Sequence, residues 1–262
     1  MSDSTHVGRP RSRLFRTGHA YADIAALLAA VEPKGVCLDL PAGTGVNIDG
    51  IRAAGFEPLA ADLFPENAAH KGVRSEKVDF TRPLPFADAS CAAVLCSEGI
   101  EHCPTQLQLL REFARVLQPG GTLLLTTPNV LNLRARLAAL LTGHKSFRGA
   151  AVSEVTQVRE TSDNGGIYIG HVFLVSYLTL RFMLRLAGFE RLRATTAKYS
   201  GSAVCLAPFM WLPVQLATRL MLRKVRRVGH PEVAAEITAH MLSPALLFGK
   251  KLILLAQKPG PA

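Results

Sequence analysis

The chain has 262 residues, of which 48% are apolar and 19% are charged, so it can bury one enzyme-sized core, and wholesale disorder is excluded. Its net charge of +10 is uneven: residues 1–20 hold four basic and one acidic residue (+3), residues 21–197 hold 17 and 17 (0), and residues 198–262 hold nine and two (+7). Basic ends on a neutral body favour contact with a membrane surface or an anionic partner and disfavour a body wrapped by nucleic acid.

The first half of the chain alternates helical and strand-like patterns. Apolar residues recur at helical spacing from Ile24 to Val31 and stop at Pro33, which predicts a first helix. The run VCLDL (36–40) predicts a buried strand, and PAGTG (41–45) predicts a turn into a helix that ends near Gly55. Three further strands are predicted at EPLAAD (57–62), KVDF (77–80) and SCAAVLCS (90–97), which show the weak alternation of a sheet covered on both faces.

The second half begins with an amphipathic helix predicted over residues 104–118, ended by the turn PGG (119–121) and followed by the strand TLLLTT (122–127). Residues 143–170 are predicted to form an irregular insertion, followed by a helix over 176–187 and a strand from Phe189. Residues 200–243 are predicted to be helical, and LFGKKLILLAQK (247–258) supplies a last strand.

This order predicts an α/β fold: a Rossmann-like, doubly wound, seven-stranded and mostly parallel sheet with a C-terminal helical insertion or lid. A ligand site is expected at the carboxyl ends of the strands. We divide the chain into a basic segment and helix (1–32), a core (33–199), an apolar and basic helical insertion (200–245), and the final strand with its tail (246–262).

The cysteines and the N-terminus bear on the compartment. The N-terminus lacks the apolar stretch of a secretory signal, and no run reaches the 18 apolar residues of a membrane-spanning helix. We therefore expect a cytoplasmic protein, with peripheral contact at the inner face of a membrane left open. The five cysteines have no C-x-x-C spacing and are expected to be buried and reduced: Cys37, Cys91, Cys96, Cys103 and Cys205.

A glycine-rich turn follows the first predicted strand. Asp39 ends that strand, and Gly43 and Gly45 would let the backbone approach a ligand at the N-terminus of the next helix. The dinucleotide fingerprint G-x-G-x-x-G would need a third glycine at position 48, where Ile48 stands. A nucleotide-dependent oxidoreductase is therefore disfavoured.

The string D-x-P-x-G-x-G resembles the first motif of class I S-adenosylmethionine-dependent methyltransferases, D/E-x-G-x-G-x-G, with Pro41 in place of the first glycine. The resemblance continues in order over about residues 33–195 and implies that S-adenosylmethionine is the cofactor. By the resemblance, Asp62 accepts hydrogen bonds from both ribose hydroxyls, and Asp79 and Phe80 lie beside the adenine. Pro41 lacks the N–H that this family offers at that position. The residues expected to bind the cofactor are Asp39, Pro41, Gly43, Gly45, Asp62, Leu63, Asp79, Phe80 and Ser97.

His102 follows the fourth predicted strand, where this family holds its acceptor. Methyl transfer from a sulfonium depends mainly on in-line placement, and a hydroxyl acceptor also needs a base. We therefore take His102 as the candidate catalytic base, with a helix-capping role as the alternative.

Glu98, Glu101 and His102 spell E-x-x-E-H, and His171 follows much later. This set resembles the metal site of small-RNA 3′-end 2′-O-methyltransferases, whose ligands suit Mg²⁺ or Mn²⁺, although that family's second histidine segment is not evident. Bacterial methyltransferases of the type 11 group carry a similar EH pair, TPN, a later GH and a helix ending in AGF, as in RLAGF (185–189) here. We favour that group over RNA methylation and assign no metal ligand, leaving open whether these four residues bind one.

Residues 203–227 combine 11 unbroken apolar residues, Val204 to Val214, with five cations from Arg219 to Arg227. The apolar run is too short to span a bilayer, so it is interpreted as a lid over the acceptor pocket, a contact with an anionic membrane surface, or an oligomer interface. The expected function is methylation of a hydroxyl or carbon on a small or amphiphilic acceptor: a lipid, glycan, quinone-like or other biosynthetic intermediate. A non-catalytic Rossmann-like module is the remaining alternative, and the acceptor, the methylated atom and the oligomeric state stay open.

Overall fold

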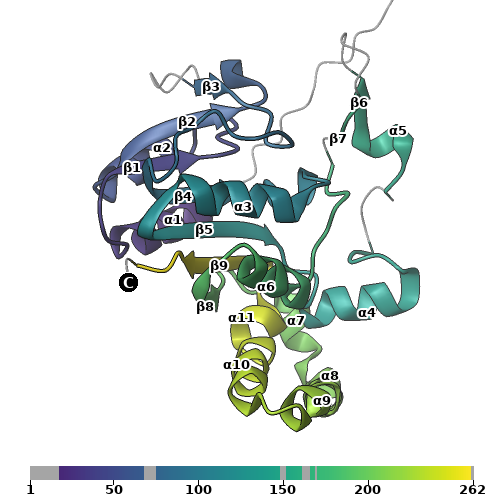
Figure 1. Cartoon of the computed structure of the whole chain (residues 1–262). Helices are drawn as coiled ribbons and strands as arrows, with labels where there is room; N and C mark the ends of the chain where they lie inside the picture. The colour runs from purple at the N-terminus through teal and green to yellow at the C-terminus, as the bar shows by residue number, and fades with distance from the viewer. Residues whose placement is uncertain (1–17, 68–74, 148–151, 161–165, 169, 261–262) are drawn as a thin grey trace, which may run out of the picture.

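The computed structural model describes residues 18–67, 75–147, 152–160, 166–168 and 170–260, and it contains a seven-stranded sheet with helices on both faces (Figure 1). Strands β1 to β5 are mutually parallel, and β9 is antiparallel to both of its neighbours, β5 and β8. The predicted α/β, mostly parallel seven-stranded fold is confirmed. The strand order is β3 (Ser75–Lys77), β2 (Glu57–Asp62), β1 (Val36–Asp39), β4 (Cys91–Ser97), β5 (Leu117–Pro128), β9 (Lys251–Gln257), β8 (Glu190–Thr195).

Helices bury both faces of this sheet. On one face, Val94 and Cys96 of β4 belong to the core that includes α3 (Gln106–Val116) and α6 (Tyr177–Leu186). On the other face, Ala93 and Leu95 pack with α1 (Gly18–Ala29) and α2 (Ile48–Ala53). Both faces need apolar side chains, which is why β4 shows no polar alternation.

The transition from α3 to β5 differs from the prediction. The helix ends at Val116 and β5 starts at Leu117, so Pro119, Gly120 and Gly121 lie inside the strand and not in a turn before it. Pairing with β4 shifts across this segment, which forms a bulge. Gly120 has a left-handed φ of +79°, and a Cβ on Gly121 would lie 3.0 Å from the carbonyl oxygen of Ala92. The glycines therefore serve the bulge.

Two other predicted segments also differ in detail. The strand predicted at 77–80 is β3, which ends at Lys77. The segment predicted to be irregular at 143–170 contains a short helix, α5 (Glu154–Gln157), and a hairpin of β6 (Val158–Glu160) with β7 (Gly166–Tyr168). This hairpin lies between α4 (Leu133–Thr142) and α6 along the chain.

Five helices lie between β8 and β9: α7 (Gly201–Cys205), α8 (Ala207–Met221), α9 (Arg223–Arg227), α10 (Pro231–Met241) and α11 (Pro244–Phe248). We call them the helical insertion. Its two ends meet, because the Ser200 N–H donates to the Phe248 carbonyl oxygen at 2.7 Å. Residues 246–248, which were expected to open the final segment with its strand, belong to α11, and β9 starts at Lys251.

Side-chain hydrogen bonds fix the insertion to the core. Arg181 of α6 donates to Glu236 of α10 at 2.7 Å. Asn129, just after β5, donates its side-chain amide to the carbonyl oxygens of Ala245, Leu246 and Gly249 at 3.2, 2.9 and 3.0 Å. The insertion therefore packs as part of the domain.

Four of the five cysteines are buried as predicted, but Cys205 at the end of α7 is exposed. Within the described ranges, no helix combines the length and the apolar character needed to cross a membrane. The basic segment at residues 1–17 lies outside the described residues.

Candidate active site

Polar side chains gather where neighbouring parallel strands end. Asp39, Asp62 and Ser97 are the last residues of β1, β2 and β4. Because these strands are parallel neighbours, their carboxyl ends share one edge of the sheet, where ligands of such folds bind. The site therefore lies along this edge.

The glycine turn after β1 faces open space. Gly43 and Gly45 have left-handed φ values of +54° and +72°, a conformation that glycine adopts at little cost. A Cβ placed on Gly43 would find no described atom within 4 Å. A ligand can thus approach the backbone here. Pro41 lies in the same turn, and a Cβ on Gly99 would sit 2.3 Å from its Cδ, so the exit of β4 needs glycine there.

Asp62 is held in place by the backbone. Its Oδ2 accepts from the Gly43 N–H at 2.7 Å, and its Oδ1 accepts from the Phe64 N–H at 2.9 Å. Each carboxylate oxygen keeps a further acceptor site, so Asp62 can receive two neighbouring hydroxyl groups. This is the geometry that a ribose diol requires.

Asp39 is completely buried beneath the turn. Burial raises the pKa of its carboxyl to about 8, opposed by the Asn47 side-chain amide 3.4 Å from Oδ1. The Asn47 Oδ1 is buried and has no hydrogen-bond partner among the described residues. An unsatisfied acceptor beside an open glycine turn fits a ligand that carries polar groups, and S-adenosylmethionine is such a ligand.

Leu63 and Asp79 line a cavity of about 320 Å³ on the β2–β3 side of the edge. Asp79 accepts from the Thr81 N–H at 3.0 Å and the Thr81 hydroxyl at 2.7 Å, and it lies 3.4 Å from Arg82. Phe80 packs against the main core and is not among the residues that line the cavity. The space suits an aromatic base, with Leu63 and Asp79 at its wall.

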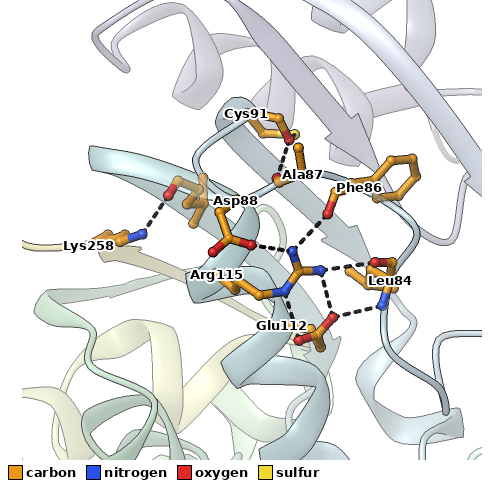
Figure 2. A network of polar contacts seen from close by, with 10 residues as sticks. Leu84, Phe86, Ala87, Asp88, Cys91, Glu112, Arg115 and Lys258 are labelled. Atoms are coloured by element: carbon orange, nitrogen blue, oxygen red, sulfur yellow. Dashed lines mark hydrogen bonds and ion pairs between the residues drawn. The ribbon is translucent and has the colours of Figure 1, made fainter.

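The loop that forms another wall of this cavity is fixed by Arg115 of α3 (Figure 2). Arg115 donates to the carbonyl oxygens of Leu84 and Phe86 at 2.9 and 2.7 Å and to Asp88 at 2.7 Å. It also bonds Glu112, which accepts from the Leu84 N–H at 2.7 Å, and its hydrogen bond lowers the pKa of Glu112. The amphipathic pattern of α3 placed these charged residues off its apolar face but gave no sign that they hold the loop.

The exit of β4 carries the second half of the site. Glu98 has a left-handed φ of +53°, and its backbone N–H donates to the Thr126 carbonyl oxygen at 3.1 Å. Its carboxylate accepts from the Thr126 hydroxyl at 3.0 Å and pairs with Lys251 at 3.3 Å. Ser97 lies 3.3 Å from the same hydroxyl. β5 and β9 thus orient the side chains that leave β4.

Glu101 lies in the short 3-10 turn Ile100–His102 and is fully buried. Its Oε2 accepts from the Thr127 hydroxyl at 3.1 Å. Its Oε1 has no hydrogen-bond partner among the described residues and lies 3.8 Å from His171 Nε2. Burial, with a smaller effect of Glu98, raises the pKa of Glu101 to about 7.

His102 and His171 meet beside Glu101, their rings edge-on with centroids 5.2 Å apart. Burial lowers the pKa of both imidazoles below 6.5, so both are neutral at pH 7. Lys145 Nζ lies 3.4 Å from His171 Nδ1. The structure thus brings His171 beside Glu101 and His102, a proximity that their spacing along the sequence could not predict.

This cluster can do two kinds of chemistry. Neutral imidazole can accept a proton from a substrate. Ligand atoms of Glu101, His102 and His171 also lie within 4.8 Å of one another, so these three could hold a divalent cation. Glu98, the fourth member of the sequence set, is not part of this group and is paired with Lys251.

A second cavity of about 320 Å³ lies near His171, between the end of β5 and the start of α4. Arg134, Lys145 and Lys250 line it, and none of its lining residues is acidic. No local pattern pointed to Lys145, Lys250 or Lys251, because they come from segments far from the E-x-x-E-H motif. Such a cavity suits a negatively charged group.

The chain matches a family model of methyltransferase domains over residues 12–194. A probable S-adenosylmethionine-dependent methyltransferase of Mycolicibacterium smegmatis is 32% identical in an alignment of 143 positions, which covers 51% of this chain and 55% of that protein. A ubiquinone biosynthesis O-methyltransferase of Xanthomonas campestris is 32% identical over 130 residues, 46% of this chain and 54% of that protein. The chain therefore spans about half the length of these curated relatives.

Among solved structures, a SAM-dependent methyltransferase from Archaeoglobus fulgidus superposes with a TM-score of 0.54 at 15% identity. The match covers 94% of this chain and 98% of that one. At this identity the likeness shows the fold.

Proposed function

The chain belongs to the S-adenosylmethionine-dependent methyltransferases, and from that premise we propose that it methylates a hydroxyl group of an amphiphilic, negatively charged acceptor, with His102 as the general base. The observation that carries this proposal is the half-buried His102 beside fully buried Glu101, where burial lowers the pKa of the imidazole. Both lie on the same edge of the sheet as Asp39, Gly43 and Asp62, the residues proposed to bind the cofactor.

The cofactor half of the edge fits S-adenosylmethionine. Asp62 would hold the ribose hydroxyls, Gly43 and Gly45 would let the backbone meet the ligand, and Leu63 and Asp79 would border the base. When bound, this cofactor supplies a methyl group on a positively charged sulfur, a good leaving group. The work left to the protein is to orient the two reactants and to exclude water.

The acceptor half supports a hydroxyl nucleophile. A hydroxyl must lose its proton as it is methylated, and a base with a pKa near or below neutral accepts that proton without first being deprotonated itself. Burial keeps the His102 imidazole neutral, opposed by a hydrogen bond to the Gly170 backbone. His171 lies next to it, as does Glu101 Oε1, which has no hydrogen-bond partner among the described residues.

Two observations support the acceptor class. The cavity lined by Arg134, Lys145 and Lys250 offers three cations and no acid to a negatively charged group. A relative named for ubiquinone biosynthesis is an O-methyltransferase, which supports O-methylation of a quinone-like or lipid intermediate. Because residues 21–197 carry no net charge, RNA is a weaker candidate.

A metal-assisted variant of the same reaction has one observation in its favour. Glu101, His102 and His171 offer ligand atoms within 4.8 Å of one another, and one Glu101 oxygen has no hydrogen-bond partner in the part of the chain that the structure describes. A divalent cation there would act on the acceptor hydroxyl in place of the base.

The test measures transfer of labelled methyl from S-adenosylmethionine into a lipid extract and a panel of hydroxylated quinone precursors. His102→Ala should lower kcat by about 10²-fold or more and remove the acid limb of the pH profile. His230→Ala, an exposed histidine before α10, is the matched control. Turnover by His102→Ala equal to that of the unaltered protein would remove His102 from the mechanism.

A further inference from the structure

Helix α8 of the helical insertion buries polar side chains and exposes apolar ones. Its uncharged polar side chains Gln215 and Thr218 are buried. Phe209, Leu212 and Leu216 are instead 78%, 67% and 58% exposed. A surface helix of a globular protein shows the opposite arrangement. Among the residues that the structure describes, none covers these apolar side chains on the outward side of α8.

The exposed apolar residues share one side of the helix. Phe209, Leu212, Leu216 and Leu220 follow one another at intervals of three and four residues, which places them on a single face. We call these four the α8 face. Trp211 is 48% exposed and lies within two residues of Phe209, at the same end of α8, but it points roughly 160° around the helix from Phe209 and is not part of this face. The opposite side of α8 packs through Val214 against α4, α7 and α11. Figure 1 shows α8 and α9 at the end of the molecule away from β1 and β2.

Positive charge adjoins the α8 face. The end of α8 and all of α9 carry five cations, and none forms an ion pair with a described residue: Arg219, Arg223, Lys224, Arg226 and Arg227. An apolar face followed by unneutralised cations is the pattern of a helix that lies in the interface of a bilayer.

We propose that the α8 face and the α9 cations dock this protein on a bilayer that contains anionic lipid. The apolar side chains would enter the boundary between headgroups and acyl chains, and the cations would meet the lipid charges. A second copy of this chain is a poorer occupant, because a symmetric contact would place like charges against each other. The chemistry of the surface thus selects the bilayer.

The docking surface is joined to the active site through β5. Asn129 holds three carbonyl oxygens at α11, and Thr127, two residues earlier, orients Glu101. The docked protein would therefore hold its acceptor mouth in a fixed relation to the membrane. The proposal adds an interaction surface to the proposed function and does not depend on it.

The experiment uses the full chain with phosphatidylcholine vesicles that contain or lack phosphatidylglycerol. Binding is measured by co-sedimentation and by the fluorescence of Trp211, the single tryptophan of the chain. We expect binding to the anionic vesicles with a blue shift of Trp211, weakened but not abolished by high salt. Neutral vesicles should bind far less.

Variants separate the contribution of the cations to vesicle binding from that of the apolar side chains. Arg223→Gln with Arg227→Gln should weaken binding about 25-fold, since each interfacial cation accounts for about fivefold. Leu212→Ser with Leu216→Ser should remove the part of binding that survives salt. Arg111→Gln on α3 and Phe182→Ser on α6 are matched controls, both exposed and outside this surface, and should change nothing. Because all these side chains are exposed, circular dichroism should show folded proteins.

Three results would overturn the proposal. The first is equal binding to neutral and anionic vesicles with a silent Trp211. The second is a solution dimer that Leu212→Ser with Leu216→Ser dissociates, which would assign the α8 face to a second copy. The third is a Trp211 response to S-adenosylmethionine without any response to vesicles, which would make α8 a lid.

Discussion

Replacing Asp62 with alanine tests the cofactor site most directly. Its carboxylate accepts from the Gly43 and Phe64 N–H groups at 2.7 and 2.9 Å, and in the proposed complex it also accepts from two ribose hydroxyls. The substitution removes the ribose contacts and frees the glycine turn from β2. Both changes weaken S-adenosylmethionine binding.

The magnitude follows from the bonds lost. Hydrogen bonds to a charged group contribute about 1.5–3 kcal/mol each, and water replaces part of what is lost, so about 2–3 kcal/mol of binding free energy is expected to disappear. At 1.4 kcal/mol per tenfold change, the Kd should rise roughly 30- to 140-fold. Asp62→Asn, which keeps one acceptor oxygen, should fall between.

Isothermal titration calorimetry with S-adenosylmethionine and with S-adenosylhomocysteine measures this change. Asp49→Ala is the control, since its carboxylate lies nearby on α2 but is 66% exposed. Gly43→Val is a second, independent lesion, because it strains a φ of +54° and fills the space before the turn. Unchanged affinity in both Asp62→Ala and Gly43→Val, with the fold intact by circular dichroism, would refute this assignment of the cofactor site.

Three further predictions concern metal, pH and thiols. Methyl transfer should continue in excess chelator; a loss that Mn²⁺ restores would instead assign a cation to Glu101, His102 and His171. Burial raises the Asp39 pKa from 3.8 to about 8, so the folded, ligand-free protein keeps a proton that the unfolded chain releases. Its stability should therefore fall between about pH 4 and pH 8, by up to roughly 5 kcal/mol, and Asp39→Asn should flatten that dependence in urea titrations; an identical pH slope would contradict this. Cys205 should be the one fast-reacting thiol in the native protein, because burial raises the pKa of the other four; a second fast thiol in a spectrophotometric count would be inconsistent with this.

The strands could be predicted where helices cover both faces of the sheet, because burial then requires an unbroken run of apolar residues. VCLDL and SCAAVLCS are unbroken apolar runs because helices cover both faces of β1 and β4. The start of β5 was predicted wrongly, because Gly120 and Gly121 have the same sequence signature in a bulge as in a turn. The pairing with β4 that distinguishes the two is a tertiary property.

The two halves of the site also differed in how far they could be predicted from the sequence. Asp39 and Asp62 end adjacent strands joined by one helix, and Gly43 lies in the turn between β1 and that helix, so the spacing of the three along the chain fixes their spacing in the fold. In the other half, Glu98 pairs with Lys251 of the last strand, β9. Only the antiparallel pairing of β5 with β9 brings Lys251 beside Glu98. No local pattern contains that information.

The α8 face shows a third limit. Apolar residues occur on every side of α8, so its sequence was compatible with a lid, a membrane contact and an oligomer interface. The packing of Val214 against α4, α7 and α11 determined which side faces inward. That choice left Phe209 and Leu212 outside and made the membrane proposal specific.

The rigid connection between the helical insertion and β5 has a consequence for substrate selection. Asn129 and Thr127 lie two residues apart on the same stretch of chain, one bound to α11 and the other to Glu101. On a bilayer, His102, the proposed base, would therefore stand at a set height above the acyl boundary. The distance between the hydroxyl and the lipid tail of an acceptor would then decide whether it is methylated. Hydroxyls at the matching distance would reach His102, and chemically identical groups nearer to the membrane or farther from it would not.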